Sequence, residues 1–308
     1  MKTNRCIICG SYESVPLFKL RDFRLDNSTE NFPYYKCRVC GLIFQNPQIS
    51  PETIVDHYNN DEIYCSATSD KGFAKVLNTY GLKKRAGVVL RLAKSGRLLD
   101  VGCGSGSFIA YLDKKSKFQV VGTEINKKHV RMLKNEKGFD VRYGNLEDIG
   151  FENSEFDVVT MWDVIEHVND PHRLLHEIRR LVIPNGYLVI RVPNGDSLDF
   201  KLFGKHWAGL DAPRHFYVFN LDTLTQLLNI HGFEILKFRF DIGGYLNAIN
   251  SLEFFLNDTK TSLPLKTFLL NTLRSKLFQV LFFPLLWIKS LFFQGTSLTV
   301  TAINNKSN

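Results

Sequence analysis

The chain has 308 residues, 44% of them apolar, so it can bury a full core; its length predicts either one large domain with a small one or two domains. Charged residues make up 23%, which excludes wholesale disorder. The net charge of +8 favours anionic partners such as nucleic acid, acidic lipid or a phosphorylated substrate, without choosing among them.

Two CxxC pairs open the chain: Cys6 with Cys9, and Cys37 with Cys40, each pair followed by glycine. A CxxC turn lets two thiolates reach one ion, and two such turns complete a tetrahedron, so the pattern predicts a structural Zn²⁺ site on these four residues. Four free or redox-active thiols are the alternative. The pattern indicates a metal site more than a disulfide framework, and hence a reducing compartment.

We call the N-terminal segment that contains the two CxxC pairs the knuckle. The residues between the two pairs indicate what role it has. It carries Lys19, Arg21 and Arg24, but acidic residues are interspersed with them. A nucleic-acid-binding ribbon needs a basic stripe and clustered stacking aromatics, and neither is evident. We therefore expect a structural or substrate-shaping role and no nucleic-acid partner.

The N-terminal residues lack the apolar core of a signal peptide, and no run reaches the ~20 uninterrupted apolar residues of a spanning helix. The predicted location is the cytoplasm, at the inner face of the membrane if the apolar insertion described below contacts lipid.

Apolar strand-like segments alternate with helical ones from Arg97 onward. The expected strands cover 97–102, 118–125, 139–144, 156–164, 186–193, 233–242 and 297–303. This alternation predicts an α/β fold built from βαβ units around a parallel sheet, with a helical insertion at 244–294 before the last strand. The predicted domains are a knuckle at 1–50, a helical linker at 51–96 and an α/β domain at 97–308.

A glycine loop follows the first of these strands, in the sequence LLDVGCGSGSF. Gly102 and Gly104 allow a tight turn and let a ligand press against the backbone, where the next helix begins. Glu124 ends the following strand, twenty residues after Gly104, where an acid binds ribose hydroxyls. The loop therefore predicts a nucleoside-containing ligand.

The residue types in the loop, among them the acidic Asp100, distinguish between two candidate ligands, NAD and S-adenosylmethionine. A nicotinamide-binding loop has the pattern G-x-G-x-x-G/A, but here the last position is Ser107. Asp100 would repel a pyrophosphate, yet it can pair with an amino group. S-adenosylmethionine carries an ammonium and no phosphate, so the loop favours it over NAD.

Several motifs resemble those of class I S-adenosylmethionine-dependent methyltransferases. DVGCGSG followed by TEIN is similar to the first two motifs, and FDVVTMWDVIEHVNDP at 156–171 resembles the fourth motif of the subgroup with ubiquinone-type O-methyltransferases. The resemblance covers about 97–243 and the last strand. It implies a Rossmann-like seven-stranded sheet, with the last strand antiparallel and helices on both faces. Similar knuckles precede the methyltransferase domain in some bacterial enzymes acting on sugars and glycans.

The resemblance also implies a donor site. Asp100, Gly102 and Gly104 would flank the methionine moiety, and Glu124 would bind ribose. Near the adenine it places Asn145 and Leu146. The family often has aspartate where Asn145 stands, so the chain departs from the pattern there.

Asp163, Glu166 and His167 lie just beyond the fourth strand and are expected to face the donor. Metal-dependent relatives carry E-x-x-E-H here, whereas this chain reads D-x-x-E-H. One interpretation is a divalent ion held by all three residues. The other is that Glu166 and His167 border the donor pocket through hydrogen bonds.

The segment DAPRHFYVF at 211–219 follows the fifth strand and is expected to overhang the methyl group. His215 there is the first candidate for the general base, which takes a proton from a hydroxyl during methyl transfer. His167 is the second candidate. The alternative for His215 is a structural role in pinning the loop.

The insertion contains the apolar run Leu277–Phe293, interrupted by Pro284 and Lys289. Since the chain must return to the same side of the sheet, a single membrane crossing is excluded. Three interpretations stay open: a substrate lid, a homodimer surface, or a monotopic contact with anionic headgroups.

Together these observations predict O-methylation of a small-molecule, sugar, glycan or lipid-linked acceptor. The alternatives are sugar C-methylation and, in another class, a nucleic-acid-binding methyltransferase-like module that reads with the zinc ribbon.

Overall fold

The computed structural model describes residues 5–25, 30–58, 72–241, 245–259, 261–275, 278, 281 and 295–305. The chain divides into two compact units. The first comprises Met1–Asn59, Val192–Gln226 and Arg239–Thr299, and the second comprises Asn60–Arg191, Leu227–Phe238 and Val300–Asn308. The predicted boundaries at 1–50, 51–96 and 97–308 stay predictions.

A seven-stranded mixed sheet, most of it in the second unit, has the order β10-β11-β8-β7-β4-β5-β6. Its strands are β4 Ser95–Val101, β5 Lys117–Glu124, β6 Asp140–Tyr143, β7 Phe156–Trp162, β8 Val182–Pro193, β10 Phe233–Asp241 and β11 Ser297–Asn304. Strands β6, β5, β4, β7 and β8 pair in parallel, and the last strand is antiparallel. The predicted fold class is confirmed.

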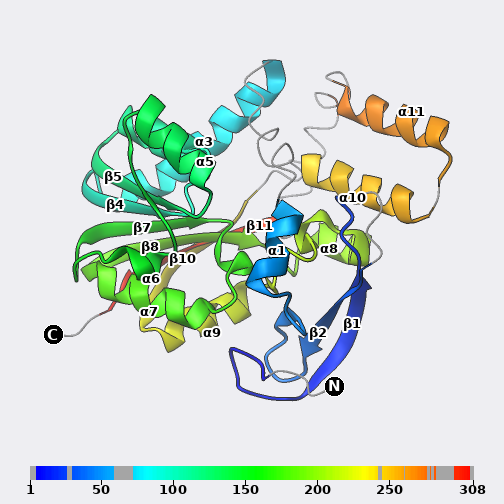
Figure 1. The fold of residues 1–308 in the computed structure, drawn as a ribbon, viewed down its shortest axis with the longest axis horizontal. Helices are drawn as coiled ribbons and strands as arrows, with labels where there is room; N and C mark the ends of the chain where they lie inside the picture. Colours follow the sequence, from blue (N-terminus) through cyan, green and yellow to red (C-terminus); the bar gives the residue numbers. More distant parts are fainter. Residues whose placement is uncertain are drawn as a thin grey trace. The chain divides into compact units, whose positions relative to one another are not determined.

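Helices cover both faces of this sheet, with α3 and α5 on one side and α6 and α7 on the other (Figure 1). The helices of this region are α3 Gly72–Leu92, α4 Ser107–Asp113, α5 Lys127–Arg131, α6 Leu146–Ile149, α7 Pro171–Leu181 and α9 Leu221–Ile230. The local sequence explains where helix α7 begins: the Asp170 side chain accepts a hydrogen bond from the Arg173 N–H as N-cap, and Pro171 occupies the first turn. Its buried stripe packs inward at Leu174, Leu175, Ile178 and Leu181.

A four-stranded antiparallel sheet belongs to the first unit, in the order β1-β2-β3-β9. Its strands are β1 Ser14–Leu20, β2 Phe32–Cys37, β3 Ile43–Gln45 and β9 Tyr217–Val218. The sequence analysis predicted no strands in residues 1–50, but three form there. The hydrophobic alternation of β1 is weak, and the pairing of β2 with β3 is set by the cysteine turn between them rather than by a strong local pattern.

The edge strand β9 comes from far along the chain. Val218 pairs with Ile43, and both are buried in one cluster with Tyr34, Trp207 and Leu210. Residues 204–218 therefore share a core with the N-terminal sheet.

The remaining helices of the first unit are α1 Pro51–Tyr58, α8 Leu198–Phe203, α10 Tyr245–Asp258 and α11 Leu263–Arg274. Helices α10 and α11 confirm that the insertion is helical in its first half. Apart from residues 278 and 281, the apolar run at 277–293 lies outside the described residues. Within the described part of the chain, no helix is both long and apolar enough to cross a membrane.

Candidate functional site

The glycine loop of the second unit joins β4 to α4 and leaves its backbone open. Gly102 has φ +66°, and a Cβ there would lie 2.8 Å from the Val164 side chain, so a larger residue does not fit. Gly104 has φ +53°, but no atom lies within 4 Å of the position of its missing Cβ. The loop thus combines a tight turn with an exposed stretch of backbone that a ligand can approach.

The Glu124 carboxylate lies beside this loop, as the sequence predicted. It is 8% exposed, and it accepts hydrogen bonds from the N–H of Gly104 at 2.7 Å and of Asn126 at 2.8 Å. These two bonds hold the carboxylate at the carboxyl edge of the sheet, next to the open backbone of Gly104. Each carboxylate oxygen still has a second lone pair that can accept from a hydroxyl.

Asp100 is buried under the same loop. Burial raises its pKa to about 7, with a further contribution from the charge of Glu124. The Thr160 hydroxyl, which donates to Asp100 at 2.6 Å, and the charge of Arg85 act in the opposite direction. A carboxyl group with such a pKa becomes fully ionised when a cation approaches, which suits an ammonium ligand.

The residues predicted near the adenine follow β6. Asn145 precedes α6 and its side-chain amide donates to Asp148 at 3.2 Å, while Leu146 is buried. They lie one strand away from Glu124, because β5 and β6 are neighbours and Glu124 pairs with Tyr143.

The predicted triad after β7 takes a different arrangement. Asp163 has φ +58° and its carboxylate is paired with the guanidinium of Arg191 on β8. Glu166 and His167 lie in a single helical turn, Ile165–His167, in which Glu166 is buried. Among the residues that the structure describes, Asp163, Glu166 and His167 do not form a three-ligand cluster. The interpretation of a divalent ion bound by these three residues stays a prediction, and the pairing of Asp163 with Arg191 favours the other interpretation, in which Glu166 and His167 border the donor pocket.

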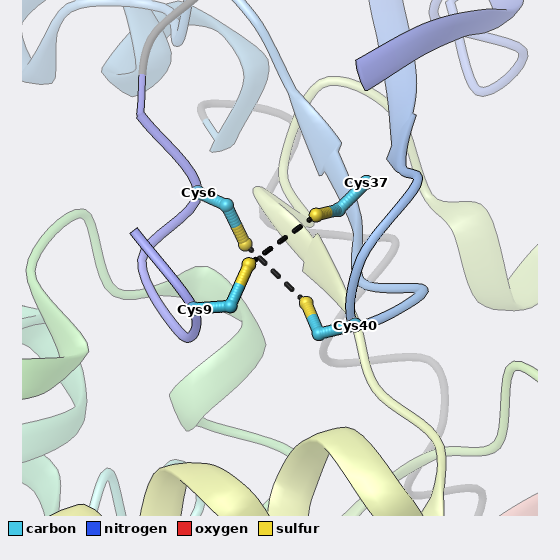
Figure 2. Close-up of side chains that lie close together, drawn as sticks. All are labelled: Cys6, Cys9, Cys37 and Cys40. Carbon is cyan, nitrogen blue, oxygen red and sulfur yellow. Dashed lines mark hydrogen bonds between the residues drawn. The ribbon is translucent and has the colours of Figure 1, made fainter. Parts of the chain in front are cut away.

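The four cysteines of the first unit converge, as Figure 2 shows. The sulfur atoms of Cys6 and Cys40 lie 3.5 Å apart, as do those of Cys9 and Cys37, and all four are within 4.8 Å of one another. Zinc–sulfur bonds of about 2.3 Å in a tetrahedron require sulfur–sulfur distances of about 3.8 Å. The cluster therefore fits Zn²⁺ without rearrangement of the backbone.

The two cysteine turns have the same hydrogen bonds. The N–H of Gly10 donates to the Cys6 carbonyl at 3.0 Å, and the N–H of Gly41 donates to the Cys37 carbonyl at 3.1 Å. Burial opposes ionisation of Cys37, yet the backbone N–H groups of Cys40 and Val39 lower its pKa to about 7. Such N–H groups favour the thiolate that a metal requires.

A buried network of charges lies elsewhere in the first unit. Arg214 donates to Asp22 at 2.7 and 2.9 Å and to Asp211 at 3.0 Å, and all three side chains are buried. Arg24 donates to Asp211 at 2.6 Å, and His57 Nδ1 lies 2.8 Å from Asp22. Asp211 and Arg214 belong to the segment 211–219 that the sequence marked as a candidate site, whereas no local pattern gave a signal for Asp22 or His57.

His215 follows this network directly. Its Nδ1 lies 2.9 Å from the carbonyl oxygen of Gly209, so Nδ1 carries the proton in the neutral ring. Burial lowers its pKa, and the charge of Asp211 only partly offsets this. The ring is therefore neutral near pH 7, with its basic lone pair on Nε2.

A family profile described as a methyltransferase domain matches residues 77–237, which is more than half of the chain. The chain belongs to this methyltransferase family. The matched domain is of the S-adenosylmethionine-dependent class. The matched range contains the glycine loop, Glu124, the turn with His167 and the segment with His215.

Two curated relatives share part of this methyltransferase's sequence. A probable S-adenosylmethionine-dependent methyltransferase of Mycolicibacterium smegmatis is 30% identical over 51% of this chain and 60% of its own length. A ubiquinone biosynthesis O-methyltransferase of Cereibacter sphaeroides is 31% identical over 36% of this chain and 47% of its own length. The chain thus spans about half of the length of these relatives.

Solved structures show the same fold as this methyltransferase. A putative sarcosine dimethylglycine methyltransferase from Galdieria sulphuraria gives a TM-score of 0.51 at 17% identity, covering 76% of this chain and 88% of that one. A phosphoethanolamine N-methyltransferase from Haemonchus contortus gives 0.51 at 15% identity, covering 86% and 62%.

Proposed function

We propose that this methyltransferase transfers the donor methyl group to a hydroxyl oxygen of a small-molecule, sugar, glycan or lipid-linked acceptor, with His215 as general base. The observation that carries the proposal is the state of His215: a buried neutral imidazole whose proton is held on Nδ1 by the Gly209 carbonyl. A base must be unprotonated before it can accept the proton of a hydroxyl, and this ring meets that condition.

The donor would be held by the loop of the second unit. Asp100 would pair with the ammonium group, Gly102 and Gly104 would flank the methionine moiety, and Glu124 would bind the ribose hydroxyls. Two residues that follow β6, Asn145 and Leu146, would contact the adenine. Support comes from the burial and raised pKa of Asp100 and from the open backbone at Gly104. Asp163 is proposed to border the donor together with Arg191, its partner.

The chemistry is a direct displacement. A lone pair of the acceptor oxygen forms a bond to the methyl carbon, the carbon–sulfur bond breaks, and its electron pair leaves the sulfur neutral. The acceptor proton passes to Nε2 of His215. Positioning of the two reactants supplies most of the acceleration in such a step. Oxygen as acceptor atom is supported by the similarity to the ubiquinone biosynthesis O-methyltransferase.

We also propose that Cys6, Cys9, Cys37 and Cys40 bind one structural Zn²⁺. The sulfur–sulfur distances and the backbone N–H groups directed at the thiolates support this assignment. Bound zinc would fix the two cysteine turns, and with them the register of β2 and β3. No step of the methyl transfer would require it.

The acceptor class can be found with a panel of quinols, nucleotide sugars and glycans, scored by formation of S-adenosylhomocysteine. Mass spectrometry of the product then decides between an O-methyl and a C-methyl group. A C-methylated sugar would contradict the proposal, since the base would then remove the proton of a carbon acid.

The base is tested with His215→Ala and His167→Ala, compared for turnover and for donor binding. We expect His215→Ala to lower turnover roughly 10²–10⁴-fold with donor affinity unchanged. His176→Ala, an exposed residue on α7, is the matched control and should retain full turnover. Near-normal turnover of His215→Ala would show that the residue only holds its loop.

A further inference from the structure

Helices α10 and α11 form a fixed pair in the first unit, joined at one end (Figure 1). Their facing sides bury Ile249, Leu256 and Leu270 in one cluster. The pair is also held by an ion pair of 2.6 Å between Arg274 and Glu253. This packing buries the side of α11 that faces α10.

Large apolar side chains are exposed near the joined end of this pair. Leu263 is 72% exposed, Leu265 50% and Phe268 67%, and Phe255 in the last turn of α10 is 43% exposed. Pro264 is exposed as well. We call these five residues the apolar tip. Leu265 and Phe268 are three residues apart on α11, so they share one face of the helix. Clustered exposed apolar residues of this kind mark interaction surfaces.

The charge of the surrounding sequence indicates what this surface binds. After Asp258 the remaining fifty residues contain no aspartate or glutamate. They contain six basic residues, namely Lys260, Lys266, Arg274, Lys276, Lys289 and Lys306. Lys266 lies within α11, between Leu265 and Phe268. Arg274 is taken up by its ion pair with Glu253, so Lys266 is the basic residue of α11 that lies next to the apolar tip without that pairing. An apolar surface beside a basic residue, in a stretch of sequence without acidic residues, is complementary to a surface that is apolar inside and anionic outside.

We propose that the apolar tip docks on an anionic lipid bilayer. Leu263, Leu265 and Phe268 would enter the boundary between headgroups and acyl chains, while Lys266 would contact the anionic headgroups. Helix α11 would lie in the plane of the interface, since its twelve residues are too few to span a bilayer. The proposal is independent of the acceptor and of the catalytic base.

The test is flotation of the full chain with vesicles of phosphatidylcholine alone or with phosphatidylglycerol added. We expect binding to the anionic vesicles, weak binding to the neutral ones, and release at high salt because exposed charges are screened. The double variant Leu265→Ser/Phe268→Ser should weaken binding by tenfold or more, since each residue loses apolar burial. Lys266→Glu should weaken it and reduce its salt dependence.

The matched control is Leu202→Ser, which removes an equally exposed leucine (71%) from α8, outside the tip. It should bind anionic vesicles like the original chain, and all variants should bind S-adenosylmethionine with unchanged affinity if they are folded. Absence of binding to anionic vesicles would overturn the proposal, as would equal binding by the double variant. The original chain could instead sediment as a dimer without binding vesicles, while the double variant sediments as a monomer. That result would assign the tip to contact with a second copy of the chain.

Discussion

Arg214 binds Asp22 through both terminal nitrogens of its guanidinium group, at 2.7 and 2.9 Å, although the two residues are 192 positions apart in the chain. Such bidentate, charge-assisted pairs fix geometry as well as charge. The pair fastens the segment with His215 to the N-terminal part of the first unit. The N-terminal residues around Asp22 therefore help to fix the conformation of the segment on which we propose the catalytic base.

Arg214→Met should destabilise the first unit strongly. It leaves the carboxylates of Asp22 and Asp211 buried without their main partner, and breaking one side of a buried pair costs about 3–5 kcal/mol. The measurement is urea unfolding followed by tryptophan fluorescence. Arg173→Met is the matched control, because the side chains of Arg173 and its partner Asp148 are 63% and 60% exposed. It should cost less than about 1 kcal/mol. Equal losses in the two variants would contradict a special role of the buried network.

Zinc content should follow the cysteine cluster. Purified protein should contain one zinc per chain, and Cys37→Ser should lose it, because three thiolates bind zinc less well than four. Elemental analysis by plasma mass spectrometry measures this. Cys103→Ala, a buried cysteine outside the cluster, should keep the metal. A folded wild-type chain without metal, purified in the absence of chelators, would refute the assignment.

Donor affinity should depend on pH through Asp100. Because its pKa is about 7 in the absence of ligand, the carboxyl group is partly protonated below neutral pH and must ionise to pair with an ammonium group. Affinity should rise between about pH 5.5 and 7.5, by at most about tenfold per pH unit, with release of a proton. Calorimetry in two buffers of different ionisation enthalpy detects that proton. In Asp100→Asn the pH dependence should vanish, and its persistence would assign it to another group.

Acid should destabilise the second unit through His231. His231 directly follows α9, and its Nε2 lies 2.8 Å from Nδ1 of His172 on α7. Burial lowers the pKa of His231, and the charges of His172 and His176 lower it further. The unfolded state therefore binds more protons as the pH falls below about 6.5, and stability is lost in that direction. Urea unfolding should be measured at pH 7.5 and at pH 5.5. The free energy of unfolding should fall less between these two pH values in His231→Asn than in the original chain. An identical loss would place the acid sensitivity elsewhere.

The sequence predicted the parts of the molecule that depend on neighbouring residues. The glycine loop and Glu124 were recognisable because they follow consecutive strands at fixed spacing, and the cysteines because each pair forms one turn. The pairing of Ile43 with Val218 and the contact of Arg214 with Asp22 were not, because they join residues more than 170 positions apart and leave no periodic signal. The pairing of Asp163 with Arg191 was missed for a related reason, since Arg191 lies on the next strand.

The central claim is that the glycine loop and Glu124 hold S-adenosylmethionine, and calorimetry of the full chain tests it most directly without knowledge of the acceptor. The original chain should bind S-adenosylmethionine and S-adenosylhomocysteine and should not bind NAD. Glu124→Ala should weaken donor binding about tenfold to a hundredfold, as expected for loss of hydrogen bonds to a charged group. Glu155→Ala, at the opposite end of the parallel strands, should leave it unchanged. Binding of NAD by the original chain, or unchanged donor affinity in Glu124→Ala, would contradict the account.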